Sequence, residues 1–413
     1  TKALLGFARS IGVEPSDLTA RTEKGGEYLY GTKFEKGLPA ASILEKILPG
    51  VVMGMECPHP LRWGDQDWRW YRAIRWVVCL LGSEVVPVEI AGKVGGRSTY
   101  GHRTLHPGQA EIPDADSYFR VMENCSVVVD QDLRRKQIVM GAQWWAKDIS
   151  GVPLIDEDLL SEVVSISEHP SAFLGRFDDQ YLSLPRDVLF TAMRHHQRYF
   201  PIVDGDGGVL PGFIGVRDGD PEEGIDIVRR GNEWVLRARL ADAEFFYEQD
   251  LKISLEDRLD DLKGVRFLRN AGTMYEKTLR LKQLTGDFAS KLGLSADDAE
   301  RARQAANLSK CDLTTALVRE FPELEGIMGG LYAANEGFRA DVAKALAQQY
   351  LPRGSKDPIP DGQVGSVLAL SDKMDTLAVA FSLGVEVSGS QDPMGLRRAA
   401  LGVVGILDRK SVV

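Results

Sequence analysis

The sequence predicts an α+β fold in which a mixed N-terminal part is followed by an all-helical part. Short β-rich runs alternate with helical periodicity up to about residue 250, and the spacing of apolar residues is helical after Leu251. A content of 44% hydrophobic and 27% charged residues is typical of a globular chain, and 413 residues exceed one ordinary core. We expect a helix and strand segment over 1–50 that packs on the next domain, an α+β domain over 51–250 and a helical domain over 251–413.

The first ninety residues predict two helices and several strands. Apolar residues from Leu4 to Ile11 have helical spacing, GEYLYGTKF (26–34) is strand-like, and a second helix over Ser42 to Leu48 is expected to stop at Pro49 and Gly50. Two β-rich runs, 74–81 and 84–90, flank Gly82 and Ser83. A two-residue turn between such runs predicts a hairpin.

The middle of the chain mixes both periodicities. Residues 117–148 predict a helix, whose apolar stripe consists of Leu133, Ile138, Met140, Trp144 and Trp145. Further strands are expected over 162–167, 171–177 and 208–216, because these runs are rich in β-branched and aromatic residues.

The last 160 residues predict helices with recognisable ends. One helical face carries Leu281, Leu284, Phe288 and Leu292. Ser295 with Asp298 three residues later has the pattern of a capping box, and Asp392 before Pro393 predicts an N-cap followed by proline in the first helical position.

Net charge and cysteine content limit the function classes. The net charge of −10 argues against a uniformly basic nucleic-acid-binding surface. Residues 1–250 hold 28 Lys+Arg against 38 Asp+Glu, whereas 251–413 hold 22 against 22, which leaves room for a local basic face in the C-terminal part if its basic residues cluster. The four cysteines contain no C-x-x-C pair, which disfavours a disulfide framework or a zinc knuckle. Without an apolar run of membrane length or a signal peptide, a cytoplasmic protein without a membrane partner is expected.

Nucleotide-binding loops are absent from the sequence. It has no G-x-x-x-x-G-K-[ST] run and no G-x-G-x-x-G run after a strand, and no synthetase ATP-site signature of either class. We therefore expect no adenylation, no catalytic residues and no cofactor on this chain. No metal is expected either, because the helical half lacks the histidines that a metal site would need.

Three phrases carry the strongest resemblance to a known family. They are HHQRYFP (195–201), GNEWVLRARLADAEFFYEQD (231–250) and SGSQDPMGLRRAALG (388–402). Further phrases in the same order are GFARSIGV, GEYLY, LRWGD, GHR, SKCDL, REFPELEGIMG, QYLPR and SDKMDTL. The set resembles the β subunit of the bacterial two-subunit glycyl-tRNA synthetase. That family's opening glycine-threonine-glutamate-glutamate-leucine-proline strand and its helical anticodon-binding region are missing, so we expect a fragment or a shortened form.

The resemblance implies a function in glycine–tRNA ligation. The reaction would convert ATP, glycine and tRNA-Gly to glycyl-tRNA, AMP and diphosphate, with ATP and Mg²⁺ used by a separate catalytic α subunit in an α2β2 assembly. This chain would bind and position the tRNA. The mixed half is expected to be similar to the tRNA-recognition domain of the phenylalanyl enzyme's β subunit. Other hypotheses are an assembly scaffold that contacts no RNA and a module that hydrolyses mischarged tRNA.

The helical half resembles HD phosphohydrolases but lacks their imidazole ligands. All six histidines precede residue 197, and Cys311 stands before Asp312. Metal-dependent hydrolysis is therefore disfavoured. Lys310 or Lys373 is then expected either to place a cation beside a buried acid or to contact phosphate, and structural use of Asp312, Asp372 and Asp375 is the favoured interpretation.

Arginine-rich phrases supply the candidate RNA contacts. Arg397 and Arg398 are adjacent on a helix, so they cannot both face the core, and the guanidinium fork suits phosphate. SGSQDP precedes this helix and is either an anion site, which Asp392 would oppose, or a structural turn. Arg229, Arg230, Arg237 and Arg239 form either a solvated face or an interdomain and tRNA-backbone surface. The predicted tRNA-binding residues are Arg62, Arg72, His102, Arg103, Arg198, Arg237, Arg239, Lys310, Lys373, Arg397 and Arg398.

The HHQRYFP phrase admits two interpretations. His195, His196 and Arg198 have no neighbouring nucleophile, which favours packing or RNA contact over acid–base catalysis. Tyr199 and Phe200 include at least one core residue, and the other is either core or a surface on which an unpaired base stacks.

Overall fold

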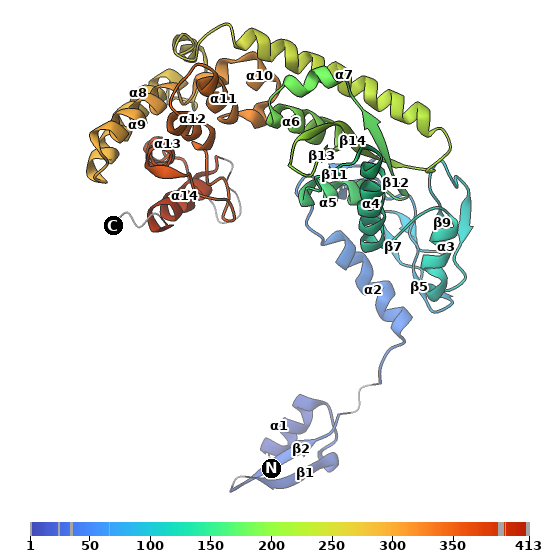
Figure 1. Cartoon of the computed structure of the whole chain (residues 1–413). Coiled ribbons are helices and arrows are strands. Elements are labelled where there is room, and N and C mark those ends of the chain that lie inside the picture. The colour runs from blue at the N-terminus through green and yellow to red at the C-terminus, as the bar shows by residue number, and fades with distance from the viewer. Residues whose placement is uncertain are drawn as a thin grey trace. The chain divides into compact units, whose positions relative to one another are not determined.

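The computed structural model describes residues 2–23, 25–33, 36–65, 67–386, 392 and 394–409. The chain divides into two units, Thr1–Val129 and Asp130–Val413 (Figure 1). Both units combine helices with antiparallel strands, which confirms a mixed α+β fold. This division differs from the boundaries expected near residues 50 and 250. The finer assignment to a 51–250 domain and a 251–413 domain stays a prediction.

The first unit is built from short, paired elements. Its helical elements are α1 (Lys2–Ile11), η1 (Pro15–Asp17), α2 (Ala40–Met53), η2 (Ala115–Ser117) and α3 (Tyr118–Asn124). Among its described residues the strands form five antiparallel pairs: β1 (Leu18–Glu23) with β2 (Gly26–Gly31), β3 (Leu61–Arg62) with β4 (Arg69–Trp70), β5 (Leu80–Leu81) with β6 (Glu84–Val85), β7 (Glu89–Ile90) with β8 (Lys93–Val94), and β9 (Ser98–Tyr100) with β10 (Gln109–Glu111). Most of these pairs are too short to bury a sheet face, so this unit has a small core.

That core lies between α2 and the segment that contains β7. Val86, Val88 and Ile90 are buried there, and Leu44 and Leu48 of α2 pack against them. The predicted turn at Gly82 and Ser83 is confirmed, although its strands are only two residues long. The expected stop at Pro49 is wrong, because α2 continues to Met53. A proline removes one intrahelical hydrogen bond, and here the bonds around it keep the helix intact.

The second unit begins with a four-stranded antiparallel sheet in the order β11-β13-β14-β12. The strands are β11 (Val152–Pro153), β12 (Pro170–Arg176), β13 (Phe200–Val203) and β14 (Val209–Asp218). The helical elements around them are α4 (Gln131–Ala146), η3 (Lys147–Ile149), α5 (Glu157–Ile166), η4 (Asp179–Ser183), α6 (Arg186–Gln197) and α7 (Ile225–Asp250). The expected strands over 171–177 and 208–216 are thereby confirmed.

Helices cover both faces of this sheet. Leu174 and Ile214 face a core shared with α4 and α5. Their neighbours Phe173 and Phe213 face the opposite core, which α6 and α7 complete. This alternation follows from the two-residue period of a strand. The core on the α7 side continues into the helices beyond residue 250, so one buried cluster crosses the expected domain boundary.

Two expectations for this region are wrong. Residues 162–166 form the last turns of α5, and residue 167 follows the helix, so no strand forms there. The helix is stabilised because the Asp156 carboxylate accepts the N–H of Leu159 in its first turn, and four apolar residues at helical spacing face the sheet. The expected helix over 117–148 is interrupted between Asn124 and Gln131. In its predicted stripe only Ile138 is buried, whereas Leu133, Met140 and Trp144 are exposed.

The rest of the second unit is helical, as expected after Leu251. Its elements are η5 (Asp260–Gly264), α8 (Met274–Lys291), α9 (Ala296–Leu308), η6 (Cys311–Thr314), α10 (Ala316–Glu320), η7 (Pro322–Leu324), α11 (Ile327–Asn335), α12 (Ala340–Gln348), α13 (Gly362–Ser382) and α14 (Leu396–Arg409). Helix α13 is central: its residues from Val364 to Lys373 are all buried, and it contacts α8, α9, α12 and α14 (Figure 1). None of the described helices is long and apolar enough to cross a lipid bilayer.

The predicted helix ends are partly confirmed. Ser295 accepts the N–H of Asp298 and so caps α9. Of the expected α8 stripe, Leu281 is buried, whereas Leu284 and Phe288 line a surface cavity of about 480 Å³. Helix α14 begins at Leu396, later than predicted, and Pro393 lies outside the described residues together with Ser388 to Gln391.

Candidate RNA-binding residues and a buried charge cluster

The predicted RNA-binding residues fall in both units. In the first unit, the side chains of Arg72 and Arg103 are exposed, and Arg62 lies 3.3 Å from the carboxylate of Asp67. His102 is buried, and its Nδ1 accepts the N–H of Leu105 at 3.2 Å. That nitrogen therefore organises the local turn.

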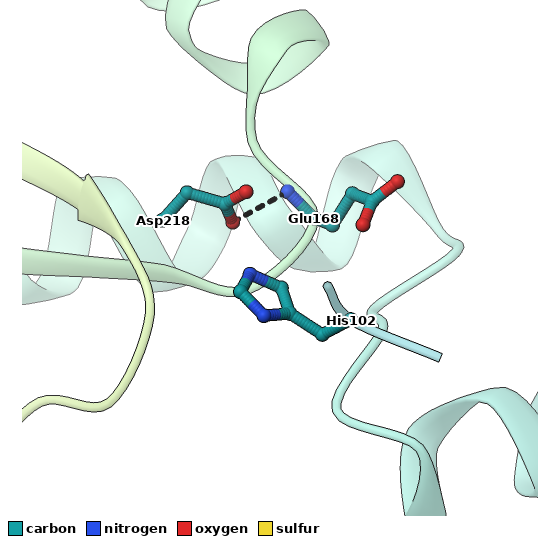
Figure 2. Close-up of side chains that lie close together, drawn as sticks. All are labelled: His102, Glu168 and Asp218. Atoms are coloured by element: carbon teal, nitrogen blue, oxygen red, sulfur yellow. Dashed lines mark hydrogen bonds between the residues drawn. The ribbon is translucent and has the colours of Figure 1, made fainter. Parts of the chain in front are cut away.

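Figure 2 draws His102 together with Glu168 and Asp218, which belong to the second unit. Asp218 ends β14, and its Oδ1 accepts the N–H of Glu168 at 2.8 Å and of His169 at 2.6 Å (Figure 2). A carboxylate that accepts two backbone N–H groups orders the chain just before β12. Neither residue stood out in the sequence, because Asp218 and Glu168 are 50 residues apart.

Arg198 ends α6 in a left-handed conformation, with φ of 58°. Its Nε lies 2.5 Å from the carboxylate of Glu162, and about half of its side chain is exposed. Tyr199 and Phe200 are both buried, and the Tyr199 ring stacks on Phe213 at 4.2 Å. Neither ring is exposed for base stacking, so both belong to the core.

The arginines of α7 lie beside acids. Arg237 is 3.1 Å from Asp178, and Arg239 is 2.8 Å from Glu320 of α10. Arg229 lies 3.1 Å from Asp226 at the start of the same helix. Because the Arg239 pair joins α7 to the helical part, this row of arginines contributes contacts within the unit.

Lys310 and Lys373, predicted as phosphate contacts, are both buried. The Nζ of Lys310 lies 3.0 Å from Asp372 Oδ1, donates to Gln349 at 2.8 Å and lies over the ring of Tyr350 at 4.1 Å. The Nζ of Lys373 donates to the backbone carbonyl of Tyr350 at 2.9 Å. Both ammonium groups therefore serve contacts inside the protein.

Two further basic residues complete this cluster. Lys277 of α8 lies 3.1 Å from both Asp372 and Asp375, and Arg280 lies 2.6 Å from Asp375. The cluster thus ties α8 and the turn before η6 to α13. The structure supports the structural interpretation of Asp372 and Asp375, with lysines as their counter-ions.

The ionisation of the cluster follows from its burial and its pairing. Burial acts to raise the pKa of Asp372, but the ammonium groups of Lys277 and Lys310 outweigh it and lower that pKa below its usual range. Burial lowers the pKa of Lys310, and Asp372 opposes this shift. Burial also lowers the pKa of Lys373 to about 8.

Asp312 lies near this cluster but is held by backbone groups. Its Oδ2 accepts the N–H of Gly326 at 2.6 Å and of Gly329 at 3.2 Å. Its Oδ1 is buried without a hydrogen-bond partner among the described residues. Burial outweighs the two N–H donors and raises the pKa of Asp312 to about 6. This acid fixes the entry to α11.

A cavity of about 380 Å³ opens beside the lysines, between Phe267 and Tyr350. Lys277, Lys310 and Asp372 contribute its polar wall. The ammonium groups of Lys277 and Lys310 lie beside Asp372, where they would repel a metal cation. The chain also has no histidine after residue 196 that could serve as a ligand. The donor set therefore does not fit a metal centre of the HD type.

Arg397 and Arg398 lie in the first turn of α14, and both are exposed. Asp392 Oδ1 accepts the N–H of Arg397 at 3.2 Å and Oδ2 accepts that of Arg398 at 3.3 Å. The Arg398 side chain lies 3.5 Å from the same carboxylate. An acid on these N–H groups disfavours an anion at the helix terminus itself, as the sequence indicated. The arginine side chains are the exposed basic groups at this place.

The loop before α13 adds basic residues to this end of α14. Arg398 shares a small hollow with Ser355 and Asp357 of that loop. Arg353 and Lys356 of the same loop are exposed. We call the exposed side chains of Arg353, Lys356, Arg397 and Arg398 the basic edge.

The model of the family described as glycyl-tRNA synthetase beta subunit matches residues 1–413. The chain belongs to this family. A protein named glycine–tRNA ligase beta subunit from Desulforudis audaxviator is 46% identical over 407 residues, which cover 98% of this chain and 59% of the relative. Proteins of the same name from Moorella thermoacetica and Synechocystis are 45% and 42% identical, over 98% of this chain and 58% and 57% of the relatives.

The chain therefore spans a little under three fifths of these glycine–tRNA ligase beta subunits. Within the matched length, SKCDL and SDKMDTL supply most of the buried charge cluster. Sequence reasoning missed Lys277 and Arg280, because Asp375, the acid that both contact, lies 98 and 95 residues away in sequence. Only the spacing of three residues between them, which puts both on one helix face, was a usable signal.

Proposed function

We propose that this chain contributes to a glycine–tRNA ligase as part of its β subunit. The reaction would join glycine to tRNA-Gly at the expense of ATP, with AMP and diphosphate as the other products. The observation that carries this proposal is the family match along all 413 residues, together with relatives at 42–46% identity that bear this name. ATP and Mg²⁺ would be used by the α subunit, because the sequence has no nucleotide-binding loop.

In this proposal the mixed part resembles the tRNA-recognition domain of the phenylalanyl enzyme's β subunit, and the helical part is HD-like without the hydrolase. A sheet with helices on both faces is compatible with the first likeness. The lysines beside Asp372 support the second, since they neutralise acids that would otherwise hold a metal ion. The helical part would then serve as a scaffold and an RNA-contacting surface.

The basic edge is the best candidate for contact with the tRNA backbone. Its four basic side chains are exposed on one loop and one helix start, whereas Lys310 and Lys373 are buried. Arginine forks and lysine ammonium groups bind phosphate oxygens without reading bases. Among the other predicted contacts, Arg72 and Arg103 are the exposed members of the first unit.

The proposed partners are the α subunit, in an α2β2 assembly, and tRNA-Gly, in the cytoplasm. A β subunit implies an α subunit, and the relatives' printed name supplies the substrate. Co-purification of the tagged chain with the α subunit tests the first partner. If the α subunit and this chain stay separate when mixed at micromolar concentrations, the α subunit is not a partner of this chain.

The tRNA contact is tested by the affinity of the chain for tRNA-Gly at low salt. The variant Arg397→Ala/Arg398→Ala removes two positive charges from the basic edge. Loss of two phosphate contacts should weaken binding by about tenfold or more, at roughly 1 kcal/mol or more per charge-assisted contact.

The matched control is Lys282→Ala/Arg303→Ala, which removes the same charge from an exposed position on α8 and a half-buried position on α9. We expect the control to bind within about twofold of the parent chain. Equal losses in both variants would mean that only net charge matters. No binding by the parent chain would favour an assembly scaffold that contacts no RNA.

A further inference from the structure

The cavity of about 380 Å³ beside Lys277 and Lys310 has the size and the lining of a ligand-binding site. Pockets that hold small molecules measure roughly 300–1,000 Å³ and combine apolar walls with a few converging polar groups. Here the apolar wall includes Phe267, Met274 and Tyr350, and the two lysines belong to the polar wall. Their side chains are only 3% and 1% exposed, so both charges are withdrawn from bulk water.

Lys310 has the capacity to bind a ligand in this cavity. Its Nζ donates to Gln349 at 2.8 Å and lies 3.0 Å from Asp372 Oδ1. An ammonium group has three N–H donors, so among the described residues one donor remains, on a nitrogen that lies over the ring of Tyr350 at 4.1 Å. The Nζ of Lys277 lies 3.1 Å from the same Asp372 oxygen and brings a second positive charge close to the first.

Three basic groups beside the cavity share two acids. Lys277 and Lys310 both lie on Asp372, and Lys277 and Arg280 both lie on Asp375. Arg280 takes both oxygens of Asp375, with its Nε at 2.6 Å and a terminal nitrogen at 3.1 Å. This leaves the two lysines with little more than the single charge of Asp372, and the group as a whole has one positive charge in excess.

Among the described residues, the other charged groups at this place cancel. Lys373 and Asp312 are both buried and contribute one charge of each sign at neutral pH. Glu325, which also lines the cavity, has Arg353 4.0 Å from its carboxylate. Burial lowers the pKa of Lys310, which reflects the cost of holding its charge away from water. Because buried charge is costly unless it is paired, a further negative charge in the cavity would be stabilising.

We propose that this cavity binds a small organic anion. Its single phosphate or carboxylate group accepts from Lys310 and lies near the charge of Lys277. Its flat apolar body lies against Phe267, Met274 and Tyr350. The polar wall combines Lys277 of α8 with the turn before η6 and with α13, which packs on α8, so the bound anion ties these segments together (Figure 1).

Other ligand classes fit this lining less well. The acids of the wall, Asp372 and Glu325, already lie beside basic side chains, so neither is left for an amine. A purely apolar ligand would cover the Lys310 ammonium group without supplying a hydrogen-bond acceptor, which is unfavourable for a charged group. An inorganic anion would compensate the charge but would leave the apolar wall without contacts.

Isothermal titration calorimetry with simple probes tests the ligand class. Phenyl phosphate and benzoate carry both a charge and a ring, inorganic phosphate carries only the charge, and phenol carries only the ring. At least one of the two aromatic anions should bind once per chain with a dissociation constant below about 1 mM, and phenol and inorganic phosphate should bind at least about tenfold more weakly. The tighter of the two aromatic anions identifies the acidic group that the site prefers. Equal binding of phenol and the aromatic anions, or no binding of either anion at about 10 mM, would overturn the proposal.

Filling the cavity tests its position. Met274→Trp adds bulk at the wall without a change of charge and should weaken binding of the aromatic anion by at least about tenfold. Leu284→Trp is the matched control, because Leu284 is also half-buried on α8 but lines the separate cavity of about 480 Å³. This control should bind within about twofold of the parent chain. Equal affinities of both variants and the parent chain would place the ligand elsewhere and overturn the proposal.

Removal of the ammonium group tests the chemistry. Lys310→Met should weaken binding of the aromatic anion by at least about tenfold and leave phenol binding unchanged. Circular dichroism at low temperature establishes that the variant is folded, and the Met274→Trp result decides if it is not. Unchanged anion affinity in folded Lys310→Met would overturn the proposal. None of these measurements involves tRNA or the α subunit, so their outcome is independent of the proposed ligation function.

Discussion

The ammonium group of Lys310 lies 3.0 Å from the carboxylate of Asp372, inside the helical part of the second unit. Lys277 lies 3.1 Å from the same carboxylate oxygen. Two lysines from separate segments thus share one acid of α13. In the fold that this part was expected to resemble, acids of this kind hold a metal ion. In this chain, cations of the chain itself lie beside the acid.

Replacement of Lys310 by methionine should destabilise the second unit by about 3 kcal/mol. The change keeps most of the side-chain volume but leaves the charge of Asp372 with one ammonium partner instead of two, and removal of one partner from a buried ion pair typically costs about 3–5 kcal/mol. The measurement is urea unfolding followed by circular dichroism. Lys282→Met, on the exposed face of α8, is the control and should change stability by less than about 0.5 kcal/mol.

A second variant separates lost charge pairing from lost packing. Lys310→Met/Asp372→Asn removes both charges, so part of the stability lost in Lys310→Met should return. If the double variant is less stable than the single one by the full cost of the second substitution, the two residues do not interact, and the pairing described above is incorrect.

Asp312 should make stability depend on pH. Its pKa is about 6 in the folded chain against 3.8 in the reference state, so the folded chain binds more protons between these values. Stability contributed by this group is therefore full below pH 4 and is lost as pH rises through 6. The unfolding free energy of the parent chain, measured relative to that of Asp312→Asn, should fall by about 3 kcal/mol from pH 4 to pH 7.

The asparagine keeps an oxygen for the N–H groups of Gly326 and Gly329, so it isolates the charge. Asp287→Asn, at an exposed position of α8, is the control for general effects of charge. A constant difference between Asp312→Asn and the parent chain over this pH range would show that Asp312 is ionised throughout.

Two glycines of the sheet should not tolerate a side chain. Gly215 lies across from Phe173 in the β12–β14 register, and Gly175 lies across from Phe213. A Cβ on Gly215 would lie 2.3 Å from the ring of Phe173. Gly215→Ala should therefore destabilise the unit by about 1–3 kcal/mol. The control Gly205→Ala has nothing within 4 Å, and equal unfolding curves for the two variants would contradict this packing.

Much of the local structure followed from the sequence, and the failures have physical causes. Strands β12 and β14 were predictable because their sequences contain aromatic or β-branched residues and β14 follows the turn-rich DGDGG. The 162–167 segment was misassigned because its β-branched residues suggest a strand, whereas the cap at Asp156 and the apolar surface of the sheet stabilise a helix. Tertiary burial overrode local preference there.

The charge cluster was only half predictable. The placement of lysines beside acids in SKCDL and SDKMDTL indicated that cations and carboxylates meet, and structural use of Asp312, Asp372 and Asp375 agrees with their contacts. The contribution of Lys277 was not predictable, because it lies about 95 residues away from its partners in sequence and approaches them only when α8 packs on α13. The burial of Lys310 and Lys373 could not be predicted from the sequence, because lysine side chains are usually exposed.

The central claim, that this chain handles tRNA within a glycine–tRNA ligase, is tested most directly by the salt dependence of its binding to tRNA-Gly. Plotted as the logarithm of the binding constant against the logarithm of salt concentration, the parent chain should show a steep negative slope, and Arg397→Ala/Arg398→Ala should make that slope shallower by about 1 to 2 units. Lys282→Ala/Arg303→Ala should leave the slope unchanged. Binding that is absent at low salt, or a slope that both variants change equally, would contradict the account.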